Sequence, residues 1–89
     1  MNELERARIE IDAIDEEIRS LFIKRMTAVK SVLAFKQANQ LPVLDTSREQ
    51  LLKHARLEKM ANHEFKSYYE SLLDALLKIS KDFQKDHYE

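Results

Sequence analysis

Apolar residues recur every three or four positions along the first third of the chain, from Leu4 to Leu33. This spacing is typical of one face of an α-helix, and no glycine or proline interrupts it. The pattern is lost after Ala38, so it predicts one amphipathic helix over about residues 3–38. The whole chain of 89 residues lacks glycine, which argues against a hairpin-rich β fold and against a glycine-rich phosphate-binding loop.

Two shorter helices are predicted after a connector that contains Pro42. Proline disfavours helix at the residue before it, and the next residues, Asp45 to Ser47, are good N-caps, with Thr46 and Glu49 spaced as a capping box. Apolar spacing then predicts helices over about residues 46–61 and 64–86, separated by a break at 61–63. We therefore expect an all-α fold of three helices, in one domain that spans residues 1–89.

The length of the first helix bears on assembly. Some 35 helical residues form a rod of about 50 Å, whereas a compact chain of this size is roughly 30 Å across. Two shorter helices cannot cover the whole apolar stripe of such a rod. A second copy is the obvious cover, so we expect the three helices to intertwine into a helical-bundle homodimer.

Charge and composition exclude several classes of partner. The 15 basic and 16 acidic residues give a net charge of −1, which argues against nucleic-acid binding. The amino terminus does not resemble a signal peptide, and no apolar run reaches the roughly 20 residues of a membrane span. With no cysteine, the chain fits a reducing compartment, and we expect a soluble, cytoplasmic protein without membrane partners.

Three cations lie on or beside the apolar stripe of the first helix: Arg8, Arg25 and Lys36. Their aliphatic stems could cover the stripe while the charged heads reach water. Arg25 and Lys36, however, share one helix face and lie about 16 Å apart, so both can reach one small ligand. Arg8 is about 25 Å from Arg25 along the rod. If all three serve one pocket, Arg8 must come from the other subunit.

Polar residues of the two later helices are further candidates. Asp45 and Glu49 begin the second helix, where carboxylates commonly do no more than cap. Ser80 and Gln84 extend the apolar line of the third helix, either because the helix leaves the core there or because they face a pocket. The histidines have no metal-ligand spacing and are expected to be exposed: His54, His63 and His87.

These residues resemble the all-helical (AroQ-class) chorismate mutases over nearly the whole chain. The resemblance runs through Arg8, Ile14-Asp15-Glu16, Arg25, Lys36, Leu41-Pro42-Val43-Leu44-Asp45, Arg48-Glu49, Ser80 and Gln84. It implies the pericyclic rearrangement of chorismate to prephenate in phenylalanine and tyrosine biosynthesis, without a covalent intermediate, cofactor or metal. Where the family often has a glycine before the lysine, this chain has Leu33, which we expect to narrow the site or to alter helix packing. Leu44 stands where relatives carry a basic residue.

The resemblance also implies a role for each site residue. Arg25 and Arg8 of the partner subunit would hold the carboxylates of the substrate, with help from Ser80. Lys36 and Gln84 would donate to the ether oxygen, at which negative charge develops. Arg48, Glu49 and the backbone at Asp45 would organise the ring hydroxyl. Val32, Leu51 and Leu77 would form apolar walls. Catalysis would thus rest on Lys36, Gln84, Arg25 and Glu49.

Two other functions remain open at this point. An isochorismate pyruvate-lyase has the same fold and a similar cationic site, but it cleaves a different substrate. A non-catalytic helical module for regulation or dimerisation would need none of these residues for chemistry.

Overall fold

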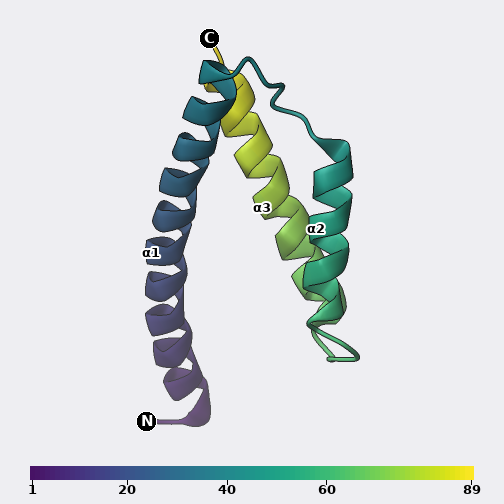
Figure 1. Cartoon of the computed structure of the whole chain (residues 1–89). Helices are drawn as coiled ribbons and strands as arrows, with labels where there is room; N and C mark the ends of the chain where they lie inside the picture. Colours follow the sequence, from purple (N-terminus) through teal and green to yellow (C-terminus); the bar gives the residue numbers. More distant parts are fainter.

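The computed structural model describes residues 1–89 as three α-helices without strands (Figure 1). Helix α1 spans Glu3–Ala38, α2 spans Thr46–Glu58 and α3 spans Lys66–His87. The all-helical fold with three helices is therefore confirmed. None of the helices is both long and apolar enough to cross a membrane.

The first two helices each begin with a residue whose side chain caps the helix N-terminus. The side chain of Asn2 accepts a hydrogen bond from the backbone N–H of Glu5 at 2.8 Å. At α2 the cap is Asp45, whose Oδ1 accepts from the N–H of Arg48 at 3.1 Å. The N-cap is thus Asp45 and not Thr46, the residue that the capping-box spacing favours. Each cap satisfies an N–H group that has no partner within its helix.

Two residues that follow helices adopt the left-handed conformation usually taken by glycine, which this chain lacks. Gln40 has φ 55° and Ala61 has φ 47°, each at a cost of about 1–2 kcal/mol. The turn at Gln40 lets the N–H of Leu41 donate to the carbonyl of Lys36 at 2.7 Å. The turn at Ala61 ends α2 at Glu58, three residues before the end predicted from apolar spacing.

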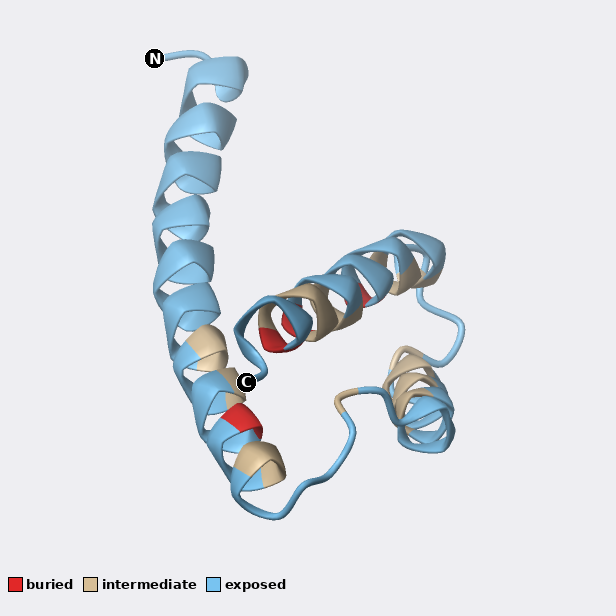
Figure 2. Ribbon diagram, turned by 90° about the horizontal axis from the view of Figure 1, so that it is seen from above, coloured by how far each residue is buried: buried red, intermediate tan, exposed pale blue.

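Helix α3 lies between the other two in the fold (Figures 1 and 2). It meets α1 where both helices approach their carboxyl ends, while the amino-terminal half of α1 runs away from the rest of the chain. Helix α2 packs along α3 and is tied to it by Lys53, whose Nζ lies 3.1 Å from Glu70 and 2.9 Å from Asp74.

A single chain buries little of its apolar surface. Only Leu33, Leu73, Ser80 and Gln84 are buried, and the molecule measures 56 × 27 × 15 Å with a radius of gyration of 16.6 Å. A compact chain of this length would have a radius of gyration of about 12 Å. The apolar stripe along the amino-terminal half of α1 is uncovered, as Figure 2 shows: Leu4, Ile11, Ile14, Ile18, Leu21 and Phe22.

Candidate active site

A cavity of about 360 Å³ lies between the three helices, near the junction of α1 and α3. Its lining comes from α1, the connector, α2 and α3 in turn: Arg25, Ala28, Val29, Val32 and Lys36; Val43 and Asp45; Arg48, Glu49, Leu52 and Arg56; Leu77, Lys81 and Gln84. Side chains from three helices and a connector thus converge on one space, although they are spread over 60 residues of sequence.

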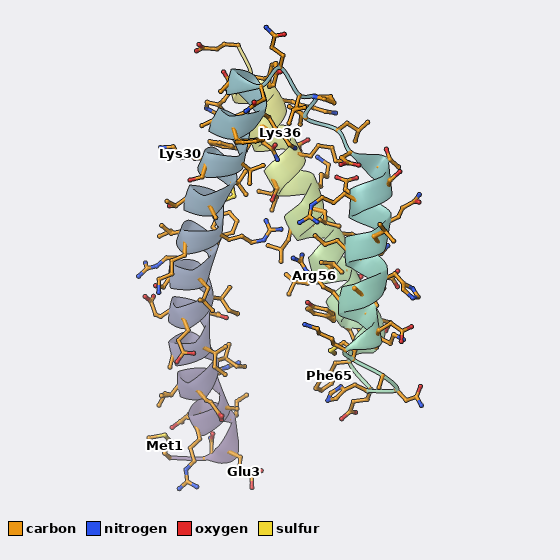
Figure 3. The ribbon with its side chains drawn as sticks, in the orientation of Figure 1. Met1, Glu3, Lys30, Lys36, Arg56 and Phe65 are labelled. Atoms are coloured by element: carbon orange, nitrogen blue, oxygen red, sulfur yellow. The ribbon has the colours of Figure 1, made fainter.

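Lys36 is held in place by two acceptors. Its Nζ donates to the carbonyl oxygen of Val43 and to Oε1 of Gln84, both at 2.9 Å. Figure 3 shows Lys36 near the carboxyl ends of α1 and α3. An ammonium group has three donors, so one remains for a ligand in the cavity.

Ser80 and Gln84 are the two buried polar residues, with exposed fractions of 9% and 7%. Gln84 Nε2 donates to the carbonyl of Ser80 at 3.2 Å, and Ser80 Oγ donates to the carbonyl of Leu76 at 2.9 Å. No buried side-chain nitrogen or oxygen lacks a partner. Of the two readings that the sequence left open, these residues therefore face the inside of the fold rather than mark an exit from the core.

Arg25 is anchored to α3. Its Nη1 donates to the carbonyl of Leu76 at 3.2 Å and to Oγ of Ser80. These bonds use Nη1 alone, so the donors on Nη2 and Nε remain free for a ligand. Burial lowers the pKa of Arg25 from its usual value, and the neighbouring charge of Arg56 lowers it further.

Glu49 does more than support the start of α2. Its Oε2 lies 3.4 Å from Nζ of Lys81 on α3, and both side chains are about 70% shielded from solvent. Asp45 provides the cap of α2, so Glu49 lines the cavity as a partner of Lys81. The ion pair links α2 to α3 across one edge of the cavity.

The structure brings together most of the residues singled out from the sequence. Those that line the cavity are Arg25, Val32, Lys36, Asp45, Arg48, Glu49, Leu77 and Gln84. Ser80 lies behind Arg25 as its hydrogen-bond acceptor. Leu33 is buried in packing and does not line the cavity, and Leu44 is exposed at the connector.

Leu51 does not form a wall of this cavity. Its side chain is 73% exposed, and Leu52 lines the cavity in its place. The reason is the rotation of α2: Arg48, Leu52 and Arg56 are four residues apart and lie on one helix face, which excludes Leu51. Arg8 also lies outside the cavity of this chain, on the exposed amino-terminal half of α1.

Two charged residues, Arg56 and Lys81, line the cavity without having been singled out from the sequence. The i, i+4 spacing from Arg48 and Leu52 is the signal that could have identified Arg56. Lys81 directly follows Ser80, and only the packing of α3 on α2 pairs it with Glu49.

The cavity is cationic with apolar walls. Five basic and two acidic side chains line it, leaving three positive charges in excess, and six lining residues are hydrophobic. None of the three histidines lines it. Such a site suits a small anion with an apolar body, held by fixed hydrogen-bond donors.

A family-level comparison agrees with this geometry. The family model for chorismate mutase type II matches residues 7–85, a range that contains every residue lining the cavity as well as Arg8. No curated protein and no solved structure matches the chain significantly. Because the matched range covers most of the sequence and the fold and cavity fit it, the chain belongs to the chorismate mutase type II family.

Proposed function

We propose that this protein catalyses the rearrangement of chorismate to prephenate, a step toward phenylalanine and tyrosine. The observation that carries the proposal is the pair of Lys36 and Gln84, held 2.9 Å apart at the wall of a cavity with three excess positive charges. Membership of the chorismate mutase type II family supports the same reaction.

The reaction takes place within one molecule. The ether C–O bond of the enolpyruvyl group breaks while a C–C bond forms to the ring, and no proton or atom leaves. The enzyme therefore needs no nucleophile; it has to hold a flexible dianion in a chair-like shape and stabilise the charge that grows on the ether oxygen. Val32, Leu52 and Leu77 supply apolar walls for the ring and the enolpyruvyl group.

Arg25 holds one carboxylate of the substrate. Its tie to α3 through Leu76 and Ser80 orients the guanidinium before the substrate arrives. Ser80 contributes through this bond, since its hydroxyl is already engaged by Arg25 and Leu76. Arg8 of the partner subunit adds a further cation for the carboxylates.

Lys36 and Gln84 stabilise the transition state. The Lys36 ammonium has one N–H without a partner in the protein, and the Gln84 amide has another. Both are available to donate to the ether oxygen. Negative charge on this oxygen grows only as the C–O bond breaks, so these contacts favour the transition state over the bound substrate. At the other end, Arg48, Glu49 and the backbone at Asp45 organise the ring hydroxyl, with Lys81 holding the Glu49 carboxylate.

The active assembly is a homodimer. The uncovered apolar stripe on α1 supports it, because monomers seldom leave such a long apolar surface in water. A second copy lying along α1 would bury the stripe and bring its own Arg8 toward the cavity. The dimer therefore completes both the core and the site.

An assay with two substrates tests the proposal. Purified protein is mixed with chorismate or with isochorismate, and the products are identified by chromatography. Formation of prephenate from chorismate supports the mutase, whereas formation of salicylate and pyruvate from isochorismate would favour the lyase. Failure to convert either compound would contradict an enzymatic role and favour the non-catalytic module.

Gln84→Glu should make activity depend on acid. The new carboxylate would lie beside the Lys36 ammonium, which favours its ionised form, and an ionised carboxylate cannot donate to the ether oxygen. The Lys36 charge lowers the pKa of this carboxyl and burial at position 84 raises it, so the pH at which activity rises reports the balance of the two effects. We expect kcat/KM at neutral pH to fall at least about tenfold and to rise as the pH is lowered.

The measurement is kcat/KM against pH for both proteins. In the unsubstituted protein the amide at position 84 donates at every ordinary pH, so its profile should show no such rise toward acid. Parallel profiles of equal height would exclude Gln84 from the donor role.

A further inference from the structure

Arg56 is a charged residue of the cavity that the proposed mechanism does not use. It lies on α2, one turn beyond Leu52, and its side chain is half-buried at the cavity wall. Figure 3 shows Arg56 on the side of α2 that faces α1. The side chain therefore points into the space that the substrate would occupy.

The other half-buried cations of the cavity all have protein partners. Lys81 is paired with Glu49 at 3.4 Å, Lys36 donates to Val43 and Gln84, and Arg25 donates to Leu76 and Ser80. The side chain of Arg56 makes no hydrogen bond or ion pair with any residue of the chain. The side chain of Arg48 also makes none, but it is exposed to solvent at the rim of the cavity. A partly desolvated guanidinium without an acceptor is unfavourable.

The charge of Arg56 acts on another cation of the cavity, Arg25. Arg56 is close enough to Arg25 to lower its pKa by repulsion. Neither of the acidic residues of the cavity pairs with them: Glu49 is engaged by Lys81, and Asp45 caps α2. Folding of the single chain thus places two guanidinium groups around one cavity, with neither paired to a carboxylate.

An anion between the two groups would turn this repulsion into attraction. Each guanidinium presents planar pairs of N–H donors that fit a carboxylate. Arg25 keeps Nη2 and Nε free, and Arg56 keeps all of its donors. We infer that Arg56 is a further substrate-binding residue, which closes together with Arg25 on one carboxylate of the substrate.

This inference rests on the proposed function for the identity of the substrate, and it makes a specific kinetic prediction. The carboxylate bears its charge before, during and after the bond rearrangement. A contact with it therefore strengthens binding of the substrate and of the transition state alike, which affects KM and not kcat. This distinguishes Arg56 from Lys36, whose loss should fall on kcat.

The test compares Arg56→Gln with Lys59→Gln, which removes the same charge from an exposed position at the end of α2. For Arg56→Gln we expect KM for chorismate to rise by about 10- to 100-fold, as for the loss of a hydrogen bond between charged groups. The kcat should stay within about twofold of the original value. Arg56→Lys should recover part of the loss in KM, and Lys59→Gln should match the unsubstituted protein.

Thermal unfolding without ligand separates substrate binding from a structural role. Because Arg56 repels Arg25, Arg56→Gln should unfold at the same temperature as the unsubstituted protein or at a higher one. A lower unfolding temperature together with dissociation of an oligomer would instead assign Arg56 to an ion pair between subunits. An unchanged KM in Arg56→Gln would also overturn the inference while leaving the mutase activity intact.

Failure of the proposed function would be seen separately, as absence of chorismate turnover by the unsubstituted protein. In that case, binding of succinate, a simple dicarboxylate, decides the inference. The binding is monitored by NMR of the arginine side-chain N–H groups. Shifts at both Arg25 and Arg56, lost or greatly weakened in Arg56→Gln, would support a shared carboxylate site. Equal succinate affinity in the two proteins would refute it.

Discussion

Replacing Lys36 with methionine should lower kcat for chorismate by about 100- to 1000-fold, the usual cost of removing one donor that faces charge in a transition state. Methionine has a similar length but cannot donate to the ether oxygen. Because that oxygen gains negative charge only as the C–O bond breaks, kcat should fall more than KM rises. Steady-state kinetics on chorismate measures both constants.

Lys30→Met is the matched control. Lys30 is exposed on the same helix and projects away from α2 and α3 (Figure 3). It loses the same charge by the same substitution, so kcat and KM should stay close to their original values. A near-normal kcat in Lys36→Met would remove Lys36 from the mechanism.

Loss of the Lys36 ammonium also has a structural cost. It leaves the Val43 carbonyl and Gln84 Oε1 without their donor, which destabilises the fold by about 1–3 kcal/mol. Lys36→Gln keeps an amide that can donate to these acceptors but carries no charge. A large loss of kcat in both variants, with helical circular dichroism retained, therefore identifies the loss of the ammonium as the cause.

The second prediction with a large effect concerns which subunit supplies Arg8 to the site. Arg8→Ala and Lys36→Ala should each be nearly inactive alone, yet a mixture of the two should regain activity. In a heterodimer, one site combines the intact Arg8 of the second chain with the intact Lys36 of the first, while the other site lacks both. Random exchange makes about half of the dimers heterodimers, so about a quarter of all sites should recover.

The mixture is assayed after partial unfolding and refolding, and heterodimers are counted by native mass spectrometry. Each variant refolded alone is the control for the procedure. If heterodimers form and no activity returns, Arg8 does not act across the subunit interface. A mass of one chain for the unsubstituted protein under assay conditions would contradict the dimer itself.

The helices follow largely from local sequence. Three- and four-residue apolar spacing predicts α1 with its observed bounds, since nothing between Leu4 and Ala38 interrupts it. Pro42 and Asp45 place the connector and the start of α2. The end of α2 was harder to predict, because Ala61, an ordinary residue in a sequence without glycine, adopts the left-handed turn.

The candidate site was predictable where a polar residue interrupts an apolar line. Arg25, Lys36, Ser80 and Gln84 stand out for this reason, and all four lie at the cavity or directly behind it. Leu51 and Leu52 are adjacent leucines, and residue type alone does not show which of them lines the cavity. Only the rotation of α2 on α3 distinguishes them, and it exposes Leu51.

By itself the sequence determined three amphipathic helices, their order and the set of cations carried on their apolar faces. The tertiary structure decided which of these charges meet: it pairs Glu49 with Lys81, joins Lys36 to Gln84 and brings Arg56 near Arg25. The physical reason is the range of the forces. Helix periodicity arises from hydrogen bonds four residues apart, whereas the angle and rotation at which helices meet depend on side-chain packing between distant segments.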